Sequence, residues 1–314
     1  MFPFSPHSPQ ARAIASLFTA TLVLAAIVFV TVSGLVSYSL LRYRARGNPN
    51  EPPQIAGSKK LEMIWTVVPL MLVIALFIIT VRTAAFIDAP LRPGQTPDLV
   101  ITGHQWWWEA RYPNGAITAS EIHIPYGRRL LAQIESADVI HDFWVPQLAR
   151  KMDAVPGLAG YIWLEADAIG AYQGACAEFC GAQHAWMRLV VIAETEESFS
   201  AWLKRQSEPA QAPTGVEATT GARLFQQMKC GDCHAISGTA AAGSRTGAAG
   251  PSGPDLTHVA SRRYLGSGIS PNTPPNLAQW ITDPQSAKPG NRMSNPNLSS
   301  QEAQALLAYL ETLQ

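Results

Sequence analysis

Two long runs without a charged residue dominate the first third of the chain. One extends over residues 13–41 and the other over residues 63–81, and the first exceeds the roughly 20 residues that a helix needs to cross a bilayer. Pro69 lies inside the second run, which spanning helices tolerate. We therefore expect a hairpin of two membrane-spanning helices, over about residues 14–41 and 62–87.

A cleaved signal peptide is the alternative interpretation of the first run. Its apolar part is too long for one, and Arg12 is the only basic residue before it. The connection between the two runs is richer in basic residues than the outer flanks, with Arg42, Arg44, Arg46, Lys59 and Lys60 against Arg12 and Arg82. Because cytoplasmic loops are enriched in Lys and Arg, we expect both termini on the periplasmic or outer face of the cell (inner) membrane.

The composition agrees with a membrane protein of several units. Of 314 residues, 47% are hydrophobic and only 15% are charged, and this length allows two or three compact units. The formal net charge is zero, which gives a nucleic-acid partner no electrostatic support.

Between residues 98 and 193, short runs of β-branched and aromatic residues alternate with Pro, Gly and Asn. The runs occupy residues 98–112, 121–127, 129–136, 141–148, 160–166 and 187–194. Regular short strands of this kind are typical of an all-β sandwich or barrel. In the first run, a single strand would point Trp106 and Trp108 to one face and Trp107 to the other.

The four cysteines form two close pairs, Cys176 with Cys180 and Cys230 with Cys233. Two local disulfides are the alternative, but a disulfide scaffold would contain more cysteines, spread along the chain. Histidine follows both pairs, which indicates metal or cofactor sites.

The first pair belongs to a run of soft ligands. Cys176, Cys180, His184 and Met187 precede the last predicted strand, and His141, 35 residues before Cys176, is the best candidate for a further ligand. Thiolates and thioethers favour copper, and two copper ions bridged by both sulfurs would use every donor. Tetrahedral zinc is the alternative, but zinc would leave Met187 without a role.

The second pair belongs to the sequence CGDCH at residues 230–234, the attachment motif of a c-type haem. Cys230 and Cys233 would bind the haem vinyl groups, and His234 would be the proximal iron ligand. A thioredoxin-like dithiol is the alternative, but such a motif needs no histidine. Residues 207–220 are rich in Pro, Ala and Thr, which predicts a flexible linker before this unit.

Electron transfer by a c-type haem also needs a second axial iron ligand. After the CGDCH motif the chain has one methionine, Met293, and His258 is the rival ligand. We expect a closing helix that Ser299 or Ser300 caps. Small residues dominate 237–253, which predicts a mobile loop.

Four stretches, GHQWWWEARYPN, DVIHDFWVPQL, KMDAVPG and CAEFCGAQHAWM, resemble subunit 2 of cytochrome c oxidase in the haem–copper oxygen reductase family. LEMIWTVVPL in the second apolar run is similar to the same family. The resemblance covers about residues 13–205 and includes the whole pattern C-x-E-x-C-x-x-x-H-x-x-M. It implies a two-helix hairpin followed by a cupredoxin-like domain that holds the dinuclear copper centre CuA.

Carried over by position, the resemblance implies a set of CuA ligands: His141, Cys176, Glu178, Cys180, His184 and Met187. Glu178 is implied to act through its carbonyl, while its side chain reaches a magnesium ion at the boundary with subunit 1. The resemblance further implies that electrons enter at Trp106, that Glu62 lies near a proton-channel mouth, and that Asp138 supports the ligand loop.

The order CGDCH, GPDL, late methionine and terminal helix is similar to a class I cytochrome c over about residues 215–314. That family usually has proline directly after the methionine, where this chain has Ser294. Together the resemblances imply a multi-domain membrane protein with a transmembrane hairpin (1–92), an all-β cupredoxin-like domain (93–206), a linker (207–220) and an all-α cytochrome c domain (221–314).

The implied function is that of the subunit through which electrons enter a proton-pumping terminal oxidase, an oxidoreductase and translocase. Electrons would pass from haem c to CuA and on to haem a of subunit 1, where dioxygen is reduced to water. The implied partners are subunits 1 and 3, the lipid bilayer, and cytochrome c or another periplasmic donor. Two alternatives are the equivalent subunit of a nitric oxide or nitrous oxide reductase and a membrane-anchored copper carrier, which would not need the haem motif.

Overall fold

The computed structural model describes residues 5–44, 54, 56–88, 94–239 and 252–314. Its contacts divide the chain into one unit of residues 12–90 and another formed by residues 1–11 and 91–314. Three expectations concern positions outside the described residues: Arg46, the boundary at residue 92, and most of the loop 237–253.

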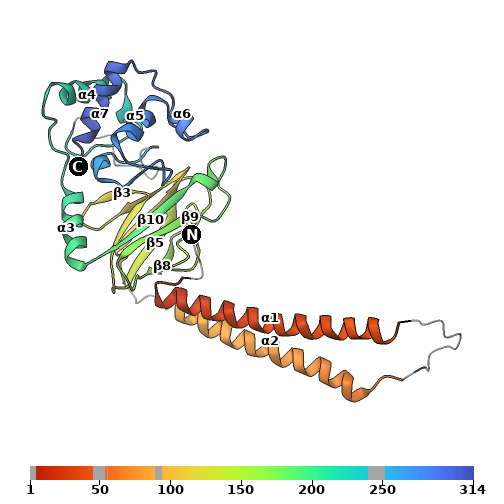
Figure 1. The fold of residues 1–314 in the computed structure, drawn as a ribbon. Helices are drawn as coiled ribbons and strands as arrows, with labels where there is room; N and C mark the ends of the chain where they lie inside the picture. Colours follow the sequence, from red (N-terminus) through yellow and green to blue (C-terminus); the bar gives the residue numbers. More distant parts are fainter. Residues whose placement is uncertain (1–4, 45–53, 55, 89–93, 240–251) are drawn as a thin grey trace. The chain divides into compact units, whose positions relative to one another are not determined.

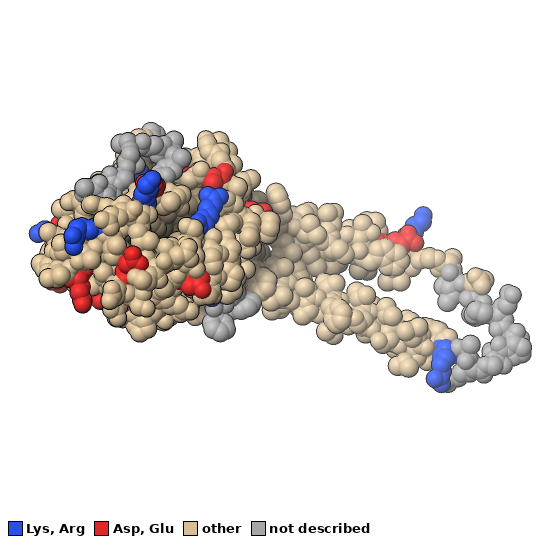
Figure 2. Space-filling model, turned by 90° about the horizontal axis from the view of Figure 1, so that it is seen from above, with Lys and Arg blue, Asp and Glu red and all other residues tan. Residues whose placement is uncertain are grey.

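Two long helices form most of the first unit, α1 (Pro9–Arg42) and α2 (Lys59–Ile87) (Figure 1). Both are long and apolar enough to cross a membrane, and on the face that Figure 2 shows they carry no charged residue along their middle. Helix α1 begins before its apolar run because Ser8 Oγ accepts a hydrogen bond from the Ala11 amide at 2.9 Å and Pro9 takes the first helical position. The predicted hairpin is confirmed.

The predicted β domain is a sandwich of two five-stranded sheets (Figure 1). One sheet has the order β3 (Ile117–Ala119), β2 (Trp107–Arg111), β1 (Leu99–His104), β5 (Leu130–Ser136) and β8 (Gly160–Leu164). The other has the order β4 (Glu121–Pro125), β10 (Arg188–Glu194), β9 (Gly170–Cys176), β6 (His141–Trp144) and β7 (Met152–Ala154). Helix α3 (Glu196–Ser207) follows β10 and buries Phe199 and Trp202 against the sandwich.

Apolar side chains from both sheets meet in one core, including Ile101, Ile134, Phe143, Leu189 and Val191. These positions alternate along their strands, as a half-buried strand requires. The packed core makes the sandwich a rigid support for the loops that leave its ends.

Residues 98–112 form a hairpin, so the expected alternation of the three tryptophans is wrong. Strands β1 and β2 pair antiparallel, and Trp106 lies in the turn between them. Trp107 and Trp108 are buried, whereas Trp106 is only half-buried. Gln105 and Trp106 are not residues that mark a turn, so the sequence did not reveal the reversal.

In residues 208–239 and 252–314, the regular structure is helical apart from the short hairpin β11 (Tyr264–Leu265) and β12 (Ser270–Pro271). Its α-helices are α4 (Val216–Gln227), α5 (Pro274–Thr282), α6 (Pro284–Ala287) and α7 (Ser300–Glu311). Ser299 caps α7 in a capping box with Glu302, which confirms one of the two predicted caps. Residues 216–220 belong to α4, so the predicted linker without regular structure is reduced to residues 208–215.

Candidate copper and haem centres

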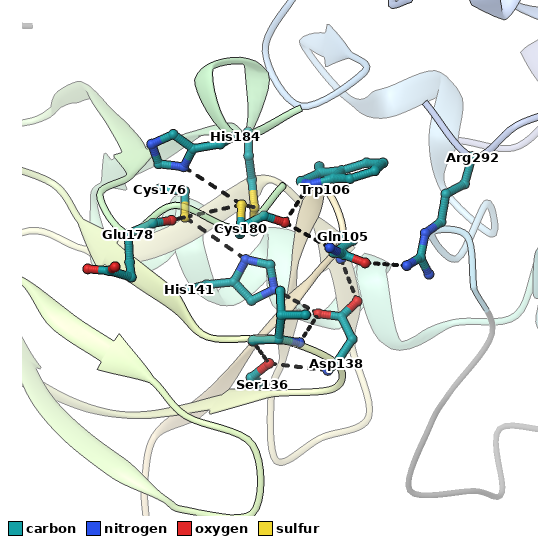
Figure 3. A network of polar contacts seen from close by, with 12 residues as sticks. Gln105, Trp106, Ser136, Asp138, His141, Cys176, Glu178, Cys180, His184 and Arg292 are labelled. Atoms are coloured by element: carbon teal, nitrogen blue, oxygen red, sulfur yellow. Dashed lines mark hydrogen bonds and ion pairs between the residues drawn. The ribbon is translucent and has the colours of Figure 1, made fainter. Parts of the chain in front are cut away.

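The predicted copper ligands gather at one end of the sandwich (Figure 3). Cys176 ends β9, while Cys180 and the 3-10 helix η1 (His184–Trp186) lie on the connection to β10, just before Met187. His141 is the first residue of β6. Two neighbouring strands and one connection therefore supply the whole set.

The two cysteine sulfurs lie in the middle of this cluster. Cys176 Sγ is 3.8 Å from Cys180 Sγ, 3.9 Å from His141 Nδ1 and 3.2 Å from the Glu178 carbonyl oxygen. Cys180 Sγ is 3.7 Å from His184 Nδ1 and 3.8 Å from Met187 Sδ. One imidazole therefore lies beside each sulfur, and these four residues together would hold a pair of metal ions.

The chemistry of the donors fits copper. Thiolate, thioether and imidazole are soft or intermediate ligands, and all four cysteines of the chain are free. Met187 is fully buried and its sulfur contacts Cys180. A zinc site would not account for that thioether, so the geometry favours copper over the zinc alternative.

The contact between the two thiols shifts their pKa values in opposite directions. The hydrogen bond with Cys180 holds the pKa of Cys176 well below its ordinary value, and the same bond raises the pKa of Cys180 well above it. Loss of the second proton would place two buried thiolates side by side. A bound cation removes that repulsion, so metal binding and proton release go together here.

Asp138 orients His141 from behind the ring. His141 Nε2 lies 2.8 Å from Asp138 Oδ1, while the backbone amide of Gln105 donates to Asp138 Oδ2 at 2.7 Å (Figure 3). Burial alone would lower the pKa of His141, but the bond to Asp138 raises it above its ordinary value. Nδ1 is thereby left facing Cys176, which is the expected supporting role for Asp138.

Glycines and one amide that the sequence did not mark also shape the site. A Cβ on Gly103 would lie 2.8 Å from Cδ2 of His141, and one on Gly181 would lie 3.2 Å from Cζ2 of Trp106. Gln105 Nε2 and Trp106 Nε1 both donate to the Cys180 carbonyl, at 2.8 and 2.9 Å. The Trp106 indole therefore lies directly against the ligand loop.

The haem motif begins directly after α4, with Cys230 in the 3-10 helix η2 (Cys230–Asp232). His234 Nδ1 is 2.8 Å from the Pro254 carbonyl oxygen, which leaves Nε2 for iron. A Cβ on Gly253 would lie 2.5 Å from Cε1 of His234, so only glycine fits there. The GPDL segment thus fixes the orientation of the predicted proximal ligand.

The two candidates for the second iron ligand differ in their hydrogen bonds. His258 Nδ1 lies 2.6 Å from a main-chain oxygen of Gln314, and its Nε2 lies 3.0 Å from the Glu208 carbonyl oxygen. Both ring nitrogens of His258 therefore lie beside main-chain oxygens. Met293 is half-buried, and Gln285 Nε2 donates to its carbonyl at 2.8 Å, so only its backbone is held.

Glu178 contacts the copper cluster through its backbone and not through its carboxylate. The Glu178 side chain is exposed and points away from the sulfurs in Figure 3, whereas its carbonyl faces Cys176. Glu62 lies in the first turn of α2.

Family comparison gives three matches in chain order. "Cytochrome C oxidase subunit II, transmembrane domain" matches residues 3–82, and "Cytochrome C oxidase subunit II, periplasmic domain" matches residues 117–194. "Cytochrome c" matches residues 218–314. The order agrees with the hairpin, the sandwich and the helical domain.

Individual proteins show the same similarity. Cytochrome c oxidase subunit 2 of Alkalihalophilus pseudofirmus is 36% identical and covers 98% of this chain and 89% of its own. That of Bacillus sp. is 32% identical, over 86% of this chain and 79% of its own. The crystal structure of the periplasmic domain of subunit II of cytochrome oxidase of Bradyrhizobium japonicum is 29% identical, over 36% of this chain and 95% of that one, with a TM-score of 0.34. The family matches and the two subunit 2 relatives show that the chain belongs to the cytochrome c oxidase subunit 2 family, with a cytochrome c domain fused to its C-terminal end.

Proposed function

We propose that this subunit takes up electrons at its cytochrome c domain and conducts them through the β domain to a partner subunit that reduces dioxygen to water and pumps protons. Family membership makes the chain the subunit through which electrons enter an oxidase; the route within it is the proposal. The observation that carries the route is the cluster of copper donors around Cys176 and Cys180. Dinuclear copper there and haem c at Cys230 and Cys233 supply reversible one-electron chemistry when bound.

At the copper cluster, the protein fixes the positions of the donor side chains and excludes water from them. His141 and Met187 are fully buried, and Cys176 and Cys180 are nearly so. Their positions are set by β6, β9 and β10 on a packed core. Donors that are already in place need little rearrangement when charge changes, which favours fast transfer.

At the haem site we propose His234 and Met293 as the axial ligands. The Pro254 contact frees Nε2 of His234, and burial lowers the pKa of His234, which favours the neutral, iron-binding ring. Both ring nitrogens of His258 lie within hydrogen-bond distance of main-chain oxygens. Methionine is then the available soft ligand, and it would raise the reduction potential relative to a second histidine.

Trp106 is our candidate for the path between the two centres. Its indole donates to the carbonyl of Cys180 at 2.9 Å, and the Arg292 guanidinium carbon lies 5.7 Å from its ring centroid. Arg292 directly precedes Met293. One side chain thus contacts both the copper loop and the segment that carries the proposed iron ligand.

We place the β and cytochrome c domains on the periplasmic face. The His7 amide donates to the Gln147 carbonyl at 2.8 Å and the Asp167 amide donates to the His7 carbonyl at 2.9 Å, so the N-terminal segment lies on the β domain. Two spans return the chain to the side from which it started, in agreement with these contacts. The basic residues between the spans then face the cytoplasm.

We further propose that subunit 1 covers the copper end of the sandwich. Ile140 and Phe179 are neighbours of copper ligands in the sequence, yet they are 46% and 77% exposed. Exposed large apolar residues beside a functional site mark a surface for a partner. The Glu178 carboxylate would meet magnesium at that boundary, Glu62 would lie near a proton-channel mouth, and subunit 3 would complete the assembly.

Affinity purification from native membranes tests this function. We expect a haem-a-containing subunit to co-purify and the preparation to consume oxygen with reduced cytochrome c as donor. Cys180→Ser should abolish that oxygen consumption while the c-type haem band stays. Co-purification with a nitric oxide or nitrous oxide reductase, or isolation of the chain alone with copper, would favour one of the alternatives.

A further inference from the structure

Within the unit that contains residues 91–314, the cytochrome c domain contacts the loops around Trp106. Ser267 Oγ donates to the Trp106 carbonyl at 3.0 Å. The amides of Arg263 and Tyr264 donate to Glu121 Oε1 at 2.6 and 2.8 Å, and Glu121 is buried. These are directed hydrogen bonds in a water-poor interface, where each unmade bond is costly.

Lys288 lies in the same interface and is almost fully buried, with 3% of its surface exposed. Its Nζ donates to the carbonyls of Gly266 at 3.1 Å, Trp186 at 3.3 Å and Trp106 at 3.4 Å. An ammonium has three N–H donors, so each N–H of Lys288 has one carbonyl acceptor. Burial lowers the pKa of Lys288 to about 8, which leaves the amine protonated at pH 7.

The three acceptors come from different parts of the chain. Gly266 belongs to the cytochrome c domain, Trp186 to the copper-ligand loop and Trp106 to the β1–β2 turn. A buried ammonium is tolerated only where its donors are satisfied. Separation of the two domains would leave two of these donors without their carbonyls, so the bonds favour one relative orientation.

Neighbours of Lys288 strengthen the same contact. Gln183 Nε2 donates to the Pro289 carbonyl, and Arg292 Nη2 donates to Gln105 Oε1 (Figure 3). Gly290 has φ +84°, and a Cβ there would lie 3.2 Å from Gln183 Nε2. The segment from Lys288 to the proposed iron ligand therefore lies against the copper domain.

We propose that Lys288 is a positioning residue that holds the cytochrome c domain in one docked orientation over Trp106. The domain then acts as a fixed internal donor, and a soluble donor delivers electrons to that domain because the Trp106 face is covered. The docking follows from the contacts alone; its effect on electron transfer rests on the proposed function.

Lys288→Met in the full-length oxidase complex tests the proposal, because it keeps side-chain length and removes all three bonds. We expect the amides of Arg263 and Tyr264 to exchange hydrogen about ten-fold faster, and haem-to-copper transfer after flash reduction to slow about ten-fold. Ten-fold corresponds to about 1.4 kcal/mol, lost with the two lysine bonds that join the domains. The optical haem band and the copper EPR signal should be unchanged. Arg223→Gln on the exposed face of α4 is the control and should alter none of these.

Ser267→Ala removes two hydrogen bonds at the same face, the one to the Trp106 carbonyl and the one that Ser120 Oγ donates to Ser267 Oγ at 3.2 Å. It serves if the lysine variant does not assemble, and its expected effect has the same direction. Unchanged amide exchange and unchanged transfer in either variant, with both spectra intact, would refute the docking role. Faster exchange with unchanged transfer would refute the role in electron transfer. Missing copper or haem signals in the unmodified protein would instead overturn the proposed function.

Discussion

At the scale of single residues, the cluster around Cys176 and Cys180 could be predicted because its donors are recognised by their chemistry. Residues 176–187 contain two thiols, one imidazole and one thioether, a combination with few other uses. Gly103, Gly181 and Gln105 could not be predicted, because their roles depend on how close other chain segments approach. The Trp106 orientation was missed for the same reason, since the turn that places it has no sequence signature.

Asp138→Asn tests how far the supporting residues control the site. The variant weakens the acceptor for His141 Nε2, so the imidazole loses its fixed orientation. We expect copper affinity to fall about 10–100-fold. Competition with a chelator of known affinity measures this. Glu197→Gln on exposed α3 is the control, and equal affinity in all three proteins would contradict the role of Asp138.

At the scale of elements, most strands were predicted from alternating β-branched and aromatic residues. Strand β9 was not, because Gly170–Cys176 is rich in Gly and Ala. It is stabilised by its antiparallel pairing with β10 and its contact with β6. Helix α4 begins inside the predicted linker, although the composition of its first turn does not favour a helix. Its packing against α7 stabilises that turn.

The pair of His123 in β4 and Glu194 in β10 predicts a pH-dependent stability of the β domain. His123 of β4 stacks on Trp202 of α3 with ring centroids 3.9 Å apart, and its Nδ1 pairs with Glu194. The hydrogen bond with His123 lowers the pKa of Glu194, although burial opposes it. A carboxylate with a lowered folded-state pKa stabilises the fold at neutral pH, and the stabilisation is lost as the pH falls through that value.

Glu194→Gln should therefore lower the free energy of unfolding of the β domain by about 1 kcal/mol at pH 7. The difference from the unmodified protein should shrink as the pH falls below the ordinary range of a glutamate. Denaturant unfolding followed by tryptophan fluorescence at several pH values measures this. A difference that stays constant with pH would contradict the assigned pair.

Gly221→Ala tests the packing of α4 on α7. A Cβ at this position would lie 1.9 Å from the Ala305 carbonyl oxygen, so the two helices must separate. We expect a loss of about 1–3 kcal/mol or more in the stability of the cytochrome c domain, seen as a lower thermal midpoint of the haem band. Thr219→Ala on the exposed side of α4 should leave that midpoint nearly unchanged.

At the scale of the whole molecule, fusion of the two domains brings the haem domain to the copper domain, a role that complementary surface charge has in separate proteins. Residues 214–314 contain seven Lys or Arg and six Asp or Glu, so long-range steering of a partner is weak. The linker keeps the domains at roughly millimolar effective concentration, and the contacts around Lys288 set their orientation. The sequence predicted the tether from composition but not the docked contact, which depends on residues far apart in the chain.

Lengthening or cleaving residues 208–215 distinguishes the effect of the tether on electron transfer from the effect of docking. Doubling this segment with Gly and Ser should slow haem-to-copper transfer less than about three-fold, since effective concentration falls only slowly with linker length. Cleavage there should make the transfer rate depend on protein concentration. Flash-induced absorbance measures both, and a cleaved protein that keeps its full rate at high dilution would show that the tether is dispensable.

The proposed centre holds two copper ions at the cysteine pair, and metal analysis with EPR of the purified native protein is the direct test. We predict two copper ions per chain and a seven-line hyperfine pattern from one electron shared between two copper nuclei, alongside a low-spin c-type haem. Zinc at this site, or a single cupric ion per chain, would contradict the account.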